Sequence, residues 1–328
     1  AALLPRRHHR DRRGQPTAEL SDRITVRRCV FEWVLVVDHT VDVSLGKKEA
    51  AVTFTNEALT DFTVSENVDA YRAALSEVRS RLGADYPLTI GGEKHETGDW
   101  IESHNPGRTT ELVGRSARGG PPEIDRALAA AWEAFHSWSA RSMEDRIDLV
   151  RRLADVMRSR RFELAAWMTF EAGKIFAEAV ADVAEAIDFC VYYAHQAPAL
   201  AGEHETYPSP GESNTSMLVP LGAGAVISPW NFPLAIFTGM AVGPAVVGNT
   251  LVLKPSPDTP IVAQTFIECA EAAGFPPGVF NLVTGADADI GDYLVDHART
   301  RFINFTGSLT TGIRINERAA TVHPGQLW

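Results

Sequence analysis

The chain has 328 residues, of which 45% are hydrophobic, so it can bury a large core and more than one domain. Its net charge of −11 argues against a nucleic-acid-binding protein or a polybasic membrane-surface protein, because both present an excess of basic side chains. No apolar run is long enough to predict a membrane span. The cysteines Cys29, Cys190 and Cys269 form no disulfide or metal-binding spacing, which predicts no metal site and indicates a reducing compartment, the cytoplasm.

Residues 1–50 differ from the rest of the chain. They open with five arginines and then show no helical or strand period (Arg6, Arg7, Arg10, Arg12 and Arg13). This pattern predicts a disordered or spurious extension, with a functional basic arm as the alternative. No Met precedes Met143, so we expect the native protein to begin near Val52, at a start codon other than that of Met.

The first structured part is predicted to be mainly helical. Apolar residues recur at helical spacing over 66–82, and Gly83 follows where a C-cap is expected. Short strand-like segments separated by turn residues come next, at 86–90, 100–104 and 111–115. Long helices are then predicted at 122–135 and from the N-cap Ser142 to about 161. Another helix leads from there to 171, and a further one spans 177–199.

The periodicity changes after Gly222. Apolar strands at 223–228, 250–254, 279–284 and 301–306 alternate with helices at 234–247, 260–273, 290–296 and 308–320. This alternation predicts an α/β fold, with a Rossmann-type parallel sheet covered by helices on both faces. Ligands bind such sheets beyond the carboxyl ends of the strands. We therefore expect 228–231, 254–256, Gly285 and 307–308 to share one rim.

Three motifs lie on this rim. In the segment 227–233, two prolines flank Asn231, whose amide could stabilise an oxyanion or only satisfy its own turn. Lys254 ends the next strand, where it could reach a ribose or phosphate or remain a solvated edge lysine. Gly307, Ser308 and Gly312 give a strand–turn–helix layout suited to a pyrophosphate. Their GxxxxG spacing matches neither the GxGxxG fingerprint nor a P-loop, so Gly307 could equally be an ordinary turn glycine.

In this order, the segments resemble the aldehyde dehydrogenase superfamily over residues 66–326. The resemblance rests on GAGAVISPWNFP (222–233), VGNTLVLKPS (247–256), AGFPPGVFNLVTG (273–285) and FINFTGSLTTG (302–312). Within the superfamily, YPLTIGG (86–92), ADVAEAIDFCVYYA (181–194), PWNFPLAIFTGM (229–240) and HPGQLW (323–328) look most like the 1-pyrroline-5-carboxylate dehydrogenases. These enzymes oxidise L-glutamate γ-semialdehyde to glutamate in proline catabolism.

The resemblance implies roles for the matching residues. Asn231 would be the oxyanion-stabilising group, Phe232 would wall the aldehyde channel, and Glu171 would be a further substrate contact. NAD is the implied cofactor, and its implied binding residues are Ile227, Ser228, Pro229, Trp230, Lys254, Ser256, Gly285, Gly307, Ser308 and Gly312. Pro257 stands where the family often has Glu, so NADP also stays open.

The resemblance also implies a domain plan. Residues 51–328 would form the N-terminal and NAD-binding part, with a small β projection at 86–115 and 205–220 that supports a homo-oligomer of the full-length protein. The family's nucleophilic Cys and its Glu base lie beyond the segment that matches 301–320, whereas Cys190 and Cys269 fall in helical patterns as small hydrophobes. We therefore expect the catalytic domain to be missing and this chain alone to be inactive. The alternatives are a non-catalytic NAD-binding module or a dehydrogenase for another aldehyde.

Overall fold

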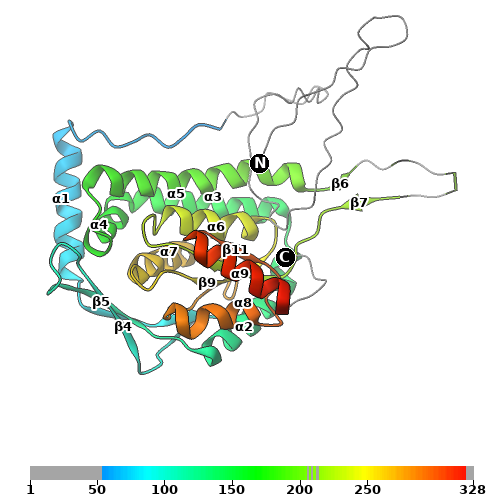
Figure 1. Ribbon diagram of the computed structural model, residues 1–328. Coiled ribbons are helices and arrows are strands. Elements are labelled where there is room, and N and C mark those ends of the chain that lie inside the picture. The colour runs from blue at the N-terminus through cyan, green and yellow to red at the C-terminus, as the bar shows by residue number, and fades with distance from the viewer. Residues whose placement is uncertain (1–53, 205–206, 208–209, 212–213, 323–328) are drawn as a thin grey trace, which may run out of the picture. The chain divides into compact units, whose positions relative to one another are not determined.

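The computed structural model describes residues 54–204, 207, 210–211 and 214–322 (Figure 1). The predictions for residues 1–50, with the proposed start near Val52, lie outside the described residues, and so does the segment 323–328. In the described part of the chain, no helix combines the length and apolar character that crossing a bilayer requires.

The elements follow the predicted order. The helices are α1 (Ser65–Ser80), α2 (Pro121–Ser139), α3 (Met143–Ser159), α4 (Arg161–Glu171), α5 (Phe176–Gln196), α6 (Ala235–Val246), α7 (Pro260–Ala273), α8 (Asp292–Asp296) and α9 (Leu309–Val322), with a 3-10 helix at Ala197–Leu200 and a π-helical turn at Asp287–Gly291. The strands are β1 (Ala84–Tyr86), β2 (Leu88–Ile90), β3 (Glu93–His95), β4 (Trp100–His104), β5 (Leu112–Ala117), β6 (Glu203–His204), β7 (Ser216–Met217), β8 (Ala223–Ile227), β9 (Thr250–Lys254), β10 (Phe280–Leu282) and β11 (Ile303–Phe305).

The larger sheet runs in the order β11-β8-β9-β10-β2-β3. Its first four strands are parallel, as predicted, but β2 pairs antiparallel with β10 and β3 antiparallel with β2. Within the β projection predicted at 86–115 and 205–220, the structure places β2 and β3 in this central sheet. Leu88, Thr89 and Ile90 are all buried, so β2 joins the central sheet instead of projecting from it. The other strands of this segment form a separate sheet, β1-β5-β4, and β6 pairs with β7 in a two-stranded ribbon.

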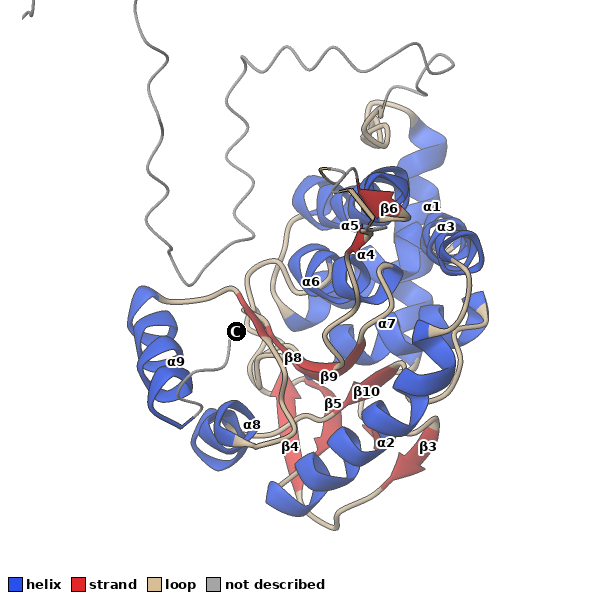
Figure 2. Cartoon of the chain, turned by 90° about the vertical axis from the view of Figure 1, so that its right-hand side faces the viewer, coloured by secondary structure: helices blue, strands red, loops and turns tan. Residues whose placement is uncertain are grey.

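Helices cover both faces of the central strands (Figure 2). Along β8, Val226 packs into one core with residues of α3–α7, while Ala225 and Ile227 pack into a second core with residues of α2, α8 and α9. Along β9, Leu253 packs into the first of these cores and Val252 into the second. Successive strand residues point to opposite faces, so an apolar run such as that of β9 buries both of its faces.

Local signals explain where several helices begin and end. The hydroxyl of Ser142 accepts the backbone N–H of Asp145 at 3.0 Å, which confirms it as the N-cap of α3. Gly274, with φ of 88°, ends α7 in the left-handed conformation that favours glycine. The helix α7 and the strand β9 accordingly have the bounds that the sequence predicts.

Candidate functional site at the carboxyl rim of the sheet

The carboxyl ends of the parallel strands meet at one rim. The register pairs Phe305 of β11 with Ile227 of β8, and Ile227 with Lys254 of β9. Hydrogen bonds continue past the strands, because the Ser228 N–H donates to the Lys254 carbonyl at 3.3 Å and the Thr306 N–H donates to the Ile227 carbonyl at 3.2 Å. The predicted site segments after β8, β9 and β11 therefore begin side by side, as the switch-point rule predicts.

The loop after β8 presents its central side chains outward. Trp230 and Phe232 are 53% and 39% exposed, and Asn231 between them is exposed too, whereas Pro233 and Leu234 on the far side are buried. No hydrogen bond joins the Asn231 amide to another described residue. The structure therefore gives no support to the alternative in which Asn231 only satisfies its own turn. A ligand on this rim could use the amide as a donor.

Lys254 is not a solvated edge lysine. The residue is only 1% exposed, and its ammonium group forms an ion pair with Asp287 while lying 3.4 Å from the Pro255 carbonyl. Asp287 itself has a largely exposed side chain in the π-helical turn that follows β10. The charged end of Lys254 is thus held at the rim, between the protein interior and a surface carboxylate. Ser256, two residues later, is half-buried and accepts the Asp258 N–H at 3.3 Å.

The turn after β11 leads into the exposed N-terminus of α9. The Ser308 hydroxyl accepts the Thr311 N–H at 3.1 Å, which makes Ser308 the N-cap of this helix. The backbone N–H groups of Leu309 and Thr310 have no acceptor among the described residues. Unsatisfied amides at the positive end of a helix are the groups that bind phosphate oxygens. This end of α9 could therefore hold an anionic ligand.

The rim glycines lie close to neighbouring side chains of the chain itself. A Cβ on Gly285 would lie 2.5 Å from the Ile290 side chain, and one on Gly307 would lie 2.6 Å from the Phe305 ring. A Cβ on Gly312 would come within 3.2 Å of the same ring. The family resemblance attributed these glycines to close approach of a cofactor, and the structure gives a second reason for Gly285 and Gly307.

Glu171, which the resemblance implied as a substrate contact, lies inside the chain in this structure. Its side chain lies at the end of α4, only 3% of the residue is exposed, and its two carboxylate oxygens accept the N–H groups of Ile261 at 2.9 Å and Val262 at 2.7 Å. Glu171 therefore caps the N-terminus of α7, in place of a cap from the helix's own sequence. Burial raises the pKa of Glu171 to about 7.

A buried ion pair behind the Asn231 loop escaped the sequence reasoning. The Lys174 ammonium lies 2.6 Å from the Asp182 carboxylate and 3.9 Å from the centroid of the Phe232 ring. The other oxygen of Asp182 accepts the Ala235 N–H at 2.7 Å, at the start of α6. Burial raises the pKa of Asp182, and Lys174 opposes that rise. The sequence signal that could have revealed this pair is Asp182, an acidic residue on the buried face of the Ala-rich helix α5.

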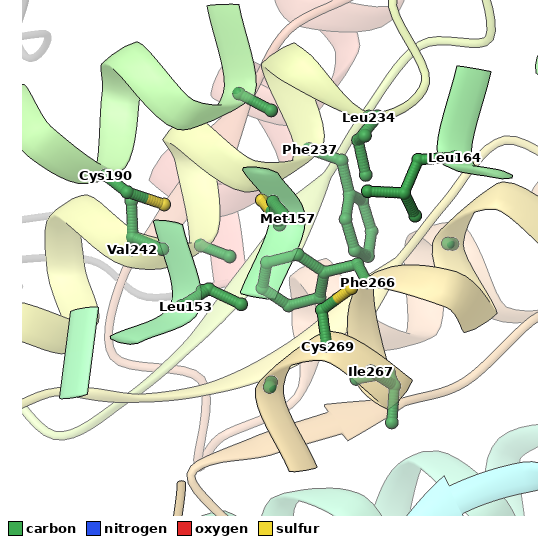
Figure 3. Packing of buried hydrophobic residues seen from close by; sticks show 14 of the residues in the cluster. Leu153, Met157, Leu164, Cys190, Leu234, Phe237, Val242, Phe266, Ile267 and Cys269 are labelled. Carbon is green, nitrogen blue, oxygen red and sulfur yellow. The ribbon is translucent and has the colours of Figure 1, made fainter. Parts of the chain in front are cut away.

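The two described cysteines are core residues. Both Cys190 and Cys269 are fully buried, and Figure 3 shows them among apolar side chains that include Met157 and Phe266. Burial raises the pKa of Cys190 above its usual range and that of Cys269 to about 11, so both thiols stay protonated at neutral pH. Their predicted role as small hydrophobes is confirmed. Within the described ranges, no group of three or more His, Cys, Asp or Glu side chains could hold a metal ion.

Comparisons with known proteins agree with this geometry. The model of the aldehyde dehydrogenase family matches residues 93–327. A 1-pyrroline-5-carboxylate dehydrogenase of Geobacillus kaustophilus is 53% identical over 275 residues, which cover 84% of this chain and 53% of the relative. One from Bacillus cereus (strain ATCC 10987 / NRS 248) is 48% identical, over 84% of this chain and 54% of the relative. The chain thus spans about half the length of the curated relatives it matches.

Solved structures give the same result. The crystal structure of a 1-pyrroline-5-carboxylate dehydrogenase from Thermus with bound NAD superposes with a TM-score of 0.82, at 49% identity, covering 84% of this chain and 54% of that one. An NAD-dependent aldehyde dehydrogenase from Sinorhizobium meliloti superposes with a TM-score of 0.71, at 32% identity, covering 75% of this chain and 50% of that one.

Proposed function

The chain belongs to the aldehyde dehydrogenase family, and we propose that it is the N-terminal and NAD-binding part of an enzyme that oxidises L-glutamate γ-semialdehyde to glutamate. The observation that carries this substrate assignment is 53% identity over 275 residues to a 1-pyrroline-5-carboxylate dehydrogenase. The NAD-dependent aldehyde dehydrogenase of Sinorhizobium meliloti is less similar, at 32% identity. A dehydrogenase for another aldehyde is the alternative.

The rim has donors that suit an anionic dinucleotide. We assign the pyrophosphate to the free N–H groups of Leu309 and Thr310 and to Ser308 at the N-terminus of α9, because these amides lack acceptors in the described chain. We assign the ribose hydroxyls to Lys254, with Ser256 beside it, and the nicotinamide side to the backbone of 227–230. NAD bound there would supply the hydride acceptor for the oxidation. With Pro257 in place of an acidic residue, NADP is the second cofactor to test.

The aldehyde side of the rim is assigned to Asn231 and Phe232. The Asn231 amide would donate a hydrogen bond to the aldehyde oxygen as negative charge develops on it, an interaction worth roughly 3 kcal/mol in comparable sites. The exposed ring of Phe232 would form an apolar wall beside it. Lys174 and Asp182, which lie behind Phe232, would fix the position of that wall.

We further propose that this chain by itself turns over no aldehyde. The reaction needs a thiolate, and the thiols of Cys190 and Cys269 are buried and protonated in the core. This observation also favours the second candidate function, a non-catalytic NAD-binding module. We propose that the complete protein is a cytoplasmic homo-oligomer. The exposed apolar side chains of Met217, Leu218 and Val219 offer a surface for association.

Calorimetric titration of the 328-residue chain with NAD, and in parallel with NADP, tests the cofactor site. Ser308→Trp should abolish binding, because the indole would cover the amides of α9. Ser137→Trp, on an exposed part of α2, is the matched control and should bind as the parent does. A folded parent chain that binds neither nucleotide would refute the assigned site.

The substrate assignment needs a separate measurement. The reading frame downstream of Trp328 should be sequenced and expressed together with this chain, and NADH formation should be followed with L-glutamate γ-semialdehyde and with acetaldehyde. A higher kcat/KM for the semialdehyde supports the proposal. A preference for acetaldehyde favours the alternative dehydrogenase, and a frame without Cys and Glu in the family context favours the binding module.

A further inference from the structure

A cavity of about 740 Å³ lies between α1, the turn that joins β4 to β5, and the end of α4. None of the residues assigned to the aldehyde or to NAD lines it. Its volume falls within the range of small-molecule sites, roughly 300–1,000 Å³.

The charge of this cavity is opposite to that of the chain. Arg72, Arg79 and Arg108 line it, with Glu111 as the acidic partner, which leaves two positive charges in excess. The net charge of the whole chain is −11. Basic side chains gathered in a concave surface raise the local concentration of anions. The cavity is therefore electrostatically suited to an anion.

The guanidinium groups of these arginines donate no hydrogen bond to the described residues. Arg79 and Arg108 lie 3.8 and 3.7 Å from the same oxygen of Glu111, and Arg72 lies 3.8 Å from Asp69. These distances exceed a hydrogen bond, and the three guanidinium groups donate to no other described residue. The side chains of Arg72, Arg79 and Arg108 are 69%, 58% and 65% exposed, respectively, so a ligand can reach them.

Some arginines outside the cavity are paired more closely. Arg115 holds both oxygens of Asp85 at 2.7 Å, and Arg118 donates twice to Asp289, at 2.9 and 2.6 Å. Such two-pronged pairing is the usual geometry between guanidinium and carboxylate groups. The cavity arginines differ from these in keeping their donors unpaired.

The walls that carry these arginines are fixed. The Arg79 guanidinium lies over the Phe170 ring, 5.2 Å from its centroid. In the turn that carries Arg108, the Asn105 amide donates to Glu111 at 2.6 Å and its carbonyl oxygen accepts the Gly107 N–H at 2.8 Å. One carboxylate oxygen of Glu111 is therefore engaged by Asn105. The donors thus face the cavity from a preformed frame.

We propose that this cavity binds a small multivalent oxyanion, a phosphate or a dicarboxylate, through the guanidinium groups of Arg72, Arg79 and Arg108. Planar guanidinium groups match carboxylate and phosphate oxygens in the same two-pronged geometry, so both anions share the recognition chemistry. This site is separate from the cofactor rim and does not depend on the proposed dehydrogenase activity.

Calorimetric titration of the 328-residue chain with inorganic phosphate, and separately with succinate, tests the site, with chloride setting a constant ionic strength. Saturable binding of one anion per chain is expected, and the stronger of the two probes identifies the class of ligand. Arg79→Gln and Arg108→Gln should each weaken binding at least about tenfold, the loss of one charged hydrogen-bonding group.

Arg126→Gln is the matched control. Arg126 is 62% exposed and makes the same kind of loose ion pair, 3.8 Å from Glu123, outside the cavity, so this variant should bind as the parent does. Arg79→Gln also removes the contact with Phe170, so the melting temperature of each variant is first compared without ligand. If Arg79→Gln is less stable than the parent, the conclusion is drawn from Arg108→Gln. Absence of saturable binding, or equal weakening in all three variants, would overturn the proposal.

Discussion

Replacing Glu171 by Gln should make the stability of the chain less dependent on pH. The folded protein raises the pKa of this carboxyl from 4.5 to about 7, mainly because the group is buried. Below pH 4.5 the group is protonated in both the folded and the unfolded chain. Between 4.5 and 7 only the unfolded chain releases the proton, so the free energy of unfolding falls as pH rises. Above about 7 both states are ionised and the loss is complete, at about 3 kcal/mol.

Urea unfolding at pH 5 and pH 8 measures this effect. The wild-type chain should lose about 2–3 kcal/mol more than Glu171→Gln between these values. The hydrogen bonds to Ile261 and Val262 also weaken in the variant, but that cost is similar at both pH values and cancels in the comparison.

Glu163→Gln is the control of opposite sign. Hydrogen bonds from Arg160 and Arg81 lower the pKa of Glu163 to about 2, so the stability it contributes is present above 4.5 and is lost only as pH falls toward 2. Between pH 5 and 8 its variant should therefore differ from the wild type by a constant amount. If Glu171→Gln keeps the wild-type pH dependence, the assignment of Glu171 as a buried cap with a raised pKa is refuted.

Three other interactions in the fold are tested by substitution, two of them with a compensating second change. Lys174→Met should lower the free energy of unfolding by about 3–5 kcal/mol, because it leaves the Asp182 carboxylate buried without its partner. Adding Asp182→Asn should recover part of this loss in urea unfolding, and a double variant no more stable than Lys174→Met would contradict the pairing. Ser142→Ala should cost about 1 kcal/mol through loss of the α3 cap, and a melting temperature equal to the wild type would argue against that cap. Gly285→Ala should cost about 1–3 kcal/mol by crowding Ile290, and Ile290→Val, which removes the nearest carbon, should relieve part of that cost; equal costs in both backgrounds would show that this carbon is not the source of the clash.

Local signals account for the parts of the fold that the sequence predicted well. The strand β9 and the helix α7 have their predicted bounds because an apolar run, a proline and a capping glycine mark them within a few residues. The shared rim was predictable for a similar reason, since parallel strands in a βα repeat must place their carboxyl ends together.

The features that the sequence did not predict all involve partners distant in the chain. Glu171 caps a helix 90 residues further on, and no local pattern distinguishes this from a loop carboxylate. The strand β2 has no helical crossover that would place it in the parallel sheet, and it enters by pairing with β10. Lys174 contacts Phe232 in the folded structure, and no local sequence pattern predicts this partner for the Lys174 ammonium.

The pairing of β2 with β10 sets an order of events during synthesis. Thr89 pairs with Leu282, and the Gly91 N–H donates to the Asn281 side chain 190 residues later. At roughly 5–20 residues per second, a ribosome needs about 10–40 s to make that intervening stretch. Throughout that time the apolar side chains of Leu88 and Ile90 have no sheet to enter. The N-terminal hairpin of β2 and β3 must therefore wait for the carboxyl-terminal strands, and a nascent chain is most exposed to aggregation and to chaperones during this interval.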